Sequence, residues 1–176
     1  PKALINRVLI FALPLLIAAG YVEIRLGDVK NSYNSHRTAF QDSASDIEVL
    51  VLGHSQAAYD IDPAQFHRVG FNLANIGQDL YYDTALTLRH IDSMPKLSTV
   101  VVTISYFGLW YKLSNESEEW RRCFYYQFWD MEPESDTFDP RNISKIALYS
   151  PGVSIDYLMQ GFDVDISRND SNGWQS

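Results

Sequence analysis

Three short apolar runs alternate with helical patterns in the middle of this chain, and this alternation constrains the fold more than any other feature. The runs are Ile47–Leu52, Gly70–Asn75 and Thr99–Ile104. A short helix is predicted over 64–69, after the start signal Asp62-Pro63, and a longer one over 82–94, before Pro95. Strands that alternate with helices favour a parallel sheet with right-handed crossovers. The third run is apolar enough to predict burial on both faces. We therefore predict an α/β domain.

The amino-terminal segment predicts a helix that anchors the chain in a membrane. The uncharged run Val8–Val22 follows two basic residues and ends at Glu23. It is slightly shorter than the roughly 20 apolar residues of a membrane span and longer than a signal-peptide core of about 7–15. Pro14 is tolerated in a membrane helix and is costly in a water-soluble one. We interpret residues 1–26 as an uncleaved signal anchor with a cytoplasmic amino terminus. A signal peptide cleaved near Ala18-Ala19-Gly20 and a buried soluble helix remain alternatives.

The rest of the chain divides into a linker and one domain. Residues 27–46 are polar and predict a linker or a loosely packed helix, followed by a domain over 47–176. Beyond Tyr106 the domain carries an aromatic-rich insertion, which we interpret as core or as a lid on the sheet, with stacking on sugar rings as the alternative. Two further helices are predicted over 141–149 and 153–162, and a polar tail over 167–176.

Charge and residue spacing exclude several classes of partner. The formal net charge is -8, whereas nonspecific binding to nucleic acid needs clustered Lys and Arg. The sequence shows no metal-ligand spacing and no glycine-rich phosphate loop. We therefore predict no nucleic-acid partner, no metal and no cofactor. The lone cysteine, Cys123, cannot form an intramolecular disulfide and is interpreted as a buried structural thiol.

The residues that follow the first two predicted strands suggest a reactive site. Ser55 comes two residues after Gly53, where the first strand stops, and ligands of open α/β sheets gather outside the carboxyl ends of strands. A serine there can act as a nucleophile, and the N–H groups of a following helix can stabilise an oxyanion. The alternative is that Ser55 only caps that helix. At the second strand, Asn75 or Gly77 could complete an oxyanion hole or could simply form the turn.

Two longer motifs resemble a known superfamily. Leu52-Gly53-His54-Ser55 with Tyr59-Asp60-Ile61-Asp62-Pro63, and then Phe71–Gln78, look like the SGNH/GDSL hydrolases. The similarity covers about 47–106 and is greatest to membrane-anchored members linked to export and O-acylation of bacterial surface polysaccharides. It implies a flavodoxin-like three-layer sandwich, in which Ser55 is the nucleophile and Gly77 an oxyanion donor. It also implies a polysaccharide or acyl-ester substrate and a membrane-bound acyltransferase or export partner. The domain would lie in the periplasm, anchored by one span in the inner membrane.

The chain departs from the superfamily pattern at three points. His54 replaces the usual aspartate before the serine, and Ser105-Tyr106 stands where an asparagine donor is expected. No Asp-x-x-His occurs in the sequence, so the usual base is missing, and a serine without a base is a poor nucleophile. The histidines are His36, His54, His67 and His90. One hypothesis is that the sequence is the amino-terminal part of a longer protein, with an incomplete sheet and a histidine further on. The other is a catalytically silent binding or scaffold subunit of a polysaccharide export complex.

Overall fold

The computed structural model describes residues 2–134, 137–149, 151–162 and 173. It is a mixed α/β structure with one small parallel sheet and a long apolar helix at the amino terminus. Contacts divide the chain into two units. Among the described residues, 2–30, 137–149 and 151–162 belong to the first unit, and 31–134 with 173 belong to the second.

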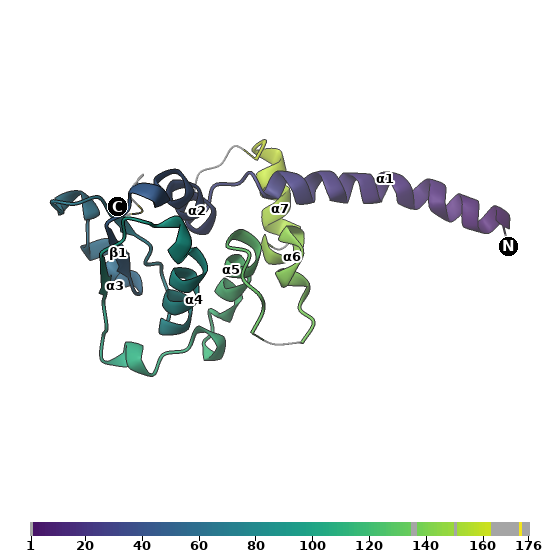
Figure 1. Ribbon diagram of the computed structural model, residues 1–176. Coiled ribbons are helices and arrows are strands. Elements are labelled where there is room, and N and C mark those ends of the chain that lie inside the picture. The colour runs from purple at the N-terminus through teal and green to yellow at the C-terminus, as the bar shows by residue number, and fades with distance from the viewer. Residues whose placement is uncertain (1, 135–136, 150, 163–172, 174–176) are drawn as a thin grey trace. The chain divides into compact units, whose positions relative to one another are not determined.

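The first unit is dominated by helix α1, Lys2–Leu26, which is the long helix at the amino terminus in Figure 1. Its stretch Asn6–Leu26 has 21 residues with a mean hydropathy of 1.9, and none of its most apolar window is buried. Length and composition are therefore sufficient for a membrane span, and a signal sequence has the same properties. The predicted long apolar helix at the amino terminus is confirmed. Its role as an anchor stays a prediction.

Two short helices complete the first unit. They are α6, Lys145–Tyr149, which follows a 3-10 turn at Pro140–Asn142, and α7, Pro151–Met159. Glu23 of α1 accepts hydrogen bonds from the Ser144 hydroxyl and from the N–H groups of Lys145 and Ile146. The carboxylate thus satisfies N–H groups at the start of α6 that have no partner within the helix.

The second unit contains the parallel sheet in the order β2-β1-β3. The strands are β1, Val49–Leu52, β2, Gly70–Asn72, and β3, Thr99–Val102. Val49 lies opposite Gly70 on one side and Thr99 on the other. Helix α3, Ser55–Asp60, connects β1 to β2, and α4, Leu80–His90, connects β2 to β3. The predicted β–α–β–α–β order and the parallel pairing are confirmed.

Two local predictions are wrong. The helix predicted over 64–69 is only a 3-10 turn at Pro63–Gln65, because the helical turns of this crossover lie earlier, in α3. Strand β3 is not buried on both faces, since Val100 is 44% and Val102 is 41% exposed. All four residues of β1 are buried. Edge position alone does not explain the difference, because β2 also lies at the edge among the described residues and buries Phe71 and Asn72.

Most of the aromatic-rich insertion lies in the core of the second unit. Helix α5, Arg122–Phe128, buries Cys123 and four aromatic side chains. It packs against α2, Ser32–Ser43, which forms within the segment predicted as linker or loose helix. Tyr33 of α2 stacks on Phe124 with ring centroids 5.0 Å apart. Of the predicted tail 167–176, only Gly173 lies within the described residues, and its carbonyl accepts a hydrogen bond from His36.

Candidate functional site

The carboxyl ends of β1 and β3 meet at a glycine. Gly53 has a φ of +133°, and a Cβ atom there would lie 2.2 Å from Thr103 Oγ1 and 3.2 Å from the Thr103 carbonyl oxygen. Only glycine adopts this conformation readily and tolerates this approach. The turn that carries Ser55 is therefore pressed against the end of β3.

Ser55 is the first residue of α3 and is partly exposed. The N-cap position is filled by His54, whose Nδ1 accepts a hydrogen bond of 3.4 Å from the Gln56 N–H, so Ser55 is not the capping residue. Its hydroxyl makes no hydrogen bond to any described residue. Helix α3 has only six residues, which limits the field at its amino terminus. The site thus presents an unpartnered hydroxyl just past the central strand.

The turn after β2 is attached to the turn after β1. The Asn75 N–H donates to the Gly53 carbonyl at 3.2 Å. Asn75 is buried, and its Oδ1 accepts from the Ile76 N–H at 2.8 Å, so this oxygen supports the turn itself. Gly77 has a φ of +70° and is partly exposed. Its N–H has no hydrogen-bond partner among the described residues. The two sequence-predicted turns are thus brought together, and a free N–H donor lies in the second.

His54 pairs with a different serine. Its Nε2 lies 2.9 Å from Ser105 Oγ, and its ring packs on Phe107 with centroids 5.3 Å apart. Because Nδ1 accepts a hydrogen bond, Nε2 carries the proton and donates to Ser105. Ser105 Oγ also accepts from the Gly108 N–H at 3.1 Å. His54 is therefore a donor that holds the turn after β3, and it is not positioned as a base for Ser55.

The remaining histidines do not reach Ser55. His36 is buried, hydrogen bonds to Gly173, and has its pKa lowered to about 4, chiefly by burial. His90 packs between Phe40 and Trp129, and burial lowers its pKa as well. His67 is exposed. In the described part of the chain, no group of three or more His, Cys, Asp or Glu side chains could hold a metal ion.

Asp83 is a site residue that the sequence motifs do not indicate. It lies on the buried face of α4, is 4% exposed, and its Oδ1 accepts from the Gly53 N–H at 2.9 Å and from Gln78 Nε2 at 2.6 Å. Gln78 in turn accepts from the Tyr125 hydroxyl at 2.8 Å. Burial raises the pKa of Asp83 to about 6. A carboxylate thus fixes the turn that carries Ser55. The available signal was an acidic residue between the apolar positions Tyr82 and Leu86 of this helix.

A cleft opens beside these turns. Its inner end is lined by residues that follow each of the three strands. They include Gly53 and His54 after β1, Asp83 on α4, and Gly108 after β3. Its outer part, of about 240 Å³, is bordered by Tyr81 and by the segment that follows β3. Comparison of the chain with protein-family models, with characterised proteins and with solved structures finds no match.

Proposed function

We propose that this chain is an SGNH-like, membrane-anchored protein that esterifies or de-esterifies a surface polysaccharide outside the cytoplasm, with Ser55 as nucleophile. One observation carries the proposal. The free Ser55 hydroxyl follows the central strand, and the hydrogen bond between Asn75 and Gly53 attaches its turn to the one that contains the free Gly77 N–H. A nucleophile and an oxyanion donor on neighbouring turns are two of the elements that acyl transfer requires, the third being a base.

In the proposed reaction, Ser55 Oγ attacks the carbonyl carbon of an acyl ester and gives its proton to a base. The Gly77 N–H donates to the oxyanion that forms. The carbonyl re-forms, the alcohol leaves with a proton, and the acyl group remains on Ser55. Water or a sugar hydroxyl then attacks this acyl-enzyme and frees Ser55. The resemblance to the superfamily implies the histidine of an Asp-x-x-His as this base.

The strand order supports the flavodoxin-like part of the proposal. Doubly wound sheets of that class have the order 2-1-3-4-5, and the observed order β2-β1-β3 matches its first three strands. We propose that α1 crosses the inner membrane once and that the domain lies in the periplasm. Alkaline phosphatase fused after Asp46 should be active, and an inactive fusion would contradict this orientation.

A catalytically silent binding or scaffold subunit of a polysaccharide export complex is the second candidate. It is favoured by the pairing of His54 with Ser105, since no described histidine is left near Ser55 to act as its base. In that case a membrane-bound acyltransferase or export protein would be the partner, and Ser55 would have no chemical role.

Hydrolysis of an aryl acetate by the protein expressed from its complete reading frame tests the leading proposal. Ser55→Ala should reduce the rate to the uncatalysed level, and Ser43→Ala, on α2 of the same unit, should leave it unchanged. Activity that survives in Ser55→Ala would show that another residue is the nucleophile. Absence of activity in the unaltered protein would favour the silent subunit.

A further inference from the structure

The cleft beside the strand ends consists of two neighbouring parts that share lining residues, both within the second unit. The inner part has a volume of about 10 Å³, which is the space of one water molecule. The outer part has a volume of about 240 Å³. Both parts are lined by Asp79, Leu80, Gly108 and Tyr111. A ligand in the outer part could therefore place one small group in the inner part, next to Gly53 and His54.

A buried carboxylate offers one unused oxygen to the inner part. Asp83 lines it and is 4% exposed. Its Oδ1 accepts the hydrogen bonds from Gly53 and Gln78, whereas Oδ2 has no partner among the described residues and is open to solvent. A single hydroxyl group of a ligand would fill the space and donate to Oδ2.

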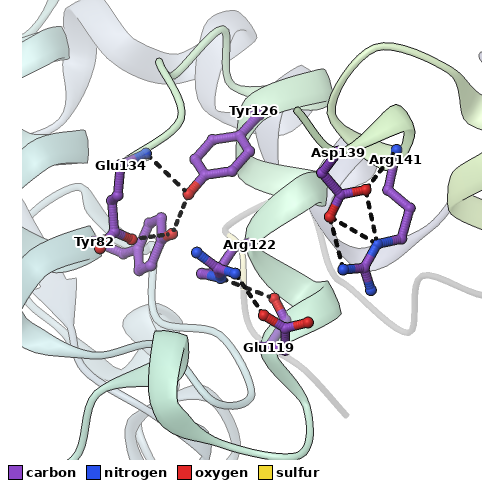
Figure 2. Close-up of polar contacts among 7 residues, drawn as sticks. All are labelled: Tyr82, Glu119, Arg122, Tyr126, Glu134, Asp139 and Arg141. Carbon is purple, nitrogen blue, oxygen red and sulfur yellow. Dashed lines mark hydrogen bonds and ion pairs between the residues drawn. The ribbon is translucent and has the colours of Figure 1, made fainter. Parts of the chain in front are cut away.

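Two sets of hydrogen bonds fix residues that line the outer part. Asp79 caps α4, where its Oδ1 accepts from the N–H groups of Tyr81 and Tyr82, and its Oδ2 accepts from the Leu113 N–H at 2.8 Å. A closed ring of hydrogen bonds holds Glu134, which also lines the outer part, as Figure 2 shows. The Glu134 N–H donates to the Tyr126 hydroxyl, which donates to Tyr82, which donates to Glu134 Oε1. The walls are thus preorganised.

The charge of the outer part discriminates between ligand classes. Tyr81 and Tyr111 line it, and the pKa of each is raised, first by burial and then by neighbouring carboxylates that include Asp79. Among the described residues that line it, Asp79 and Glu134 are acidic and Lys112 is the one cation. An anionic ligand would be repelled, and a neutral ligand with several hydroxyl groups could donate to the carboxylates while an apolar face lies on a tyrosine ring.

We propose that this cleft binds one neutral sugar ring, which lies against Tyr111 and places a single hydroxyl on Asp83 Oδ2. The outer volume is smaller than the roughly 300–1,000 Å³ of sites for drug-sized ligands, which suits one ring. The inference rests on the proposed function, in which the polysaccharide gives or receives the acyl group. It names the part of the polysaccharide that the site holds.

Saturation-transfer NMR on the full chain in detergent tests the proposal with D-glucose, D-galactose and N-acetyl-D-glucosamine as probes. At least one should bind, and Tyr111→Ala should weaken its binding tenfold or more. Tyr106→Ala is the matched control, because this tyrosine belongs to the same segment, is 89% exposed and lines neither part of the cleft. If Tyr111→Ala fails to fold, Ser114→Trp provides the test instead. Its side chain would fill the outer part from a different position and should abolish binding.

D-Glucuronate provides a second comparison, since it differs from D-glucose by one carboxylate. At pH 7 it should bind at least tenfold more weakly than D-glucose. Saturation transfer to none of the neutral sugars, equal binding by the Tyr111→Ala and Tyr106→Ala variants, or equal binding of glucuronate and glucose would overturn the proposal. Ser55→Ala should retain sugar binding while it loses ester hydrolysis. If the protein hydrolysed the ester but bound none of the sugars, the sugar-binding proposal would fail and the proposed function would stand.

Discussion

The turns after β1 and β3 each contain a serine, and the two hydroxyl groups differ in their hydrogen bonding. Ser55 follows β1 and its hydroxyl has no partner among the described residues, whereas Ser105 follows β3 and accepts hydrogen bonds from His54 and Gly108. A serine with both lone pairs occupied holds a loop in place, and an unpartnered one is available to a substrate. The comparison assigns the supporting role to Ser105 and the reactive role to Ser55.

The glycines of the two turns should differ most in their tolerance of a side chain. Gly53→Ala places a Cβ atom 2.2 Å from Thr103 Oγ1 at a φ of +133°, so we expect a loss of about 3–4 kcal/mol in the free energy of unfolding. Gly108→Ala places it 3.0 Å from Ser105 Oγ without left-handed backbone, so a loss of about 1 kcal/mol is expected. Urea unfolding followed by tryptophan fluorescence measures both. Equal losses would contradict the tighter approach at Gly53.

Asp83 should make the stability of the β1 turn depend on pH. The pKa of its carboxyl is about 6 in the folded state, above the ordinary value of 3.8, because it is buried. The folded state therefore binds the extra proton between these values, and the contribution of Asp83 to stability falls as pH rises from about 4 to about 6.

Asp83→Asn should remove this dependence, since the amide oxygen can still accept from Gly53 and Gln78. The variant should gain stability relative to the unaltered protein as pH rises from 4 to 7, by up to about 3 kcal/mol at the ordinary conversion of pKa into free energy. Urea unfolding at several pH values measures this difference. A difference that is constant with pH would show that the carboxyl is not perturbed. Asp83→Ala leaves the Gly53 N–H and Gln78 Nε2 without their acceptor, and should lower the free energy of unfolding by about 2–3 kcal/mol.

Ser105→Ala should cost more stability than Ser55→Ala. The first removes the acceptor for His54 Nε2 and the Gly108 N–H, so we expect a loss of about 1–2 kcal/mol. The second removes a hydroxyl without a described partner and should stay within about 0.5 kcal/mol. Chemical denaturation of the two variants side by side is the measurement. A larger loss in Ser55→Ala would show that this hydroxyl has a structural role.

The backbone plan of the second unit could be predicted from the sequence. The aliphatic runs that end at Leu52 and near Asn72 fix two strands, and Pro95 separates α4 from β3. Their alternation with helices was enough to predict parallel pairing. The exposure of β3 was not predictable, because an apolar strand has the same composition whether or not other elements cover its faces.

The partners of the site residues could not be predicted in the same way. Ser55, Asn75 and Gly77 were found from their places after strands, which is a local property. The pairing of His54 with Ser105 joins residues 51 positions apart, and that of Asp83 with Gly53 joins residues 30 positions apart. Such contacts depend on the tertiary placement of the turns. The sequence also left open whether a histidine could serve Ser55, and the observed pairing of His54 sharpens that question.

Covalent labelling with a fluorophosphonate tests the central assignment most directly. The protein expressed from its complete reading frame would be treated with the reagent, digested, and the modified peptide located by mass spectrometry. The account predicts phosphonylation at Ser55, loss of labelling in Ser55→Ala and retained labelling in Ser105→Ala. Modification of Ser105, or no modification of either serine, would contradict the reactive role assigned to Ser55.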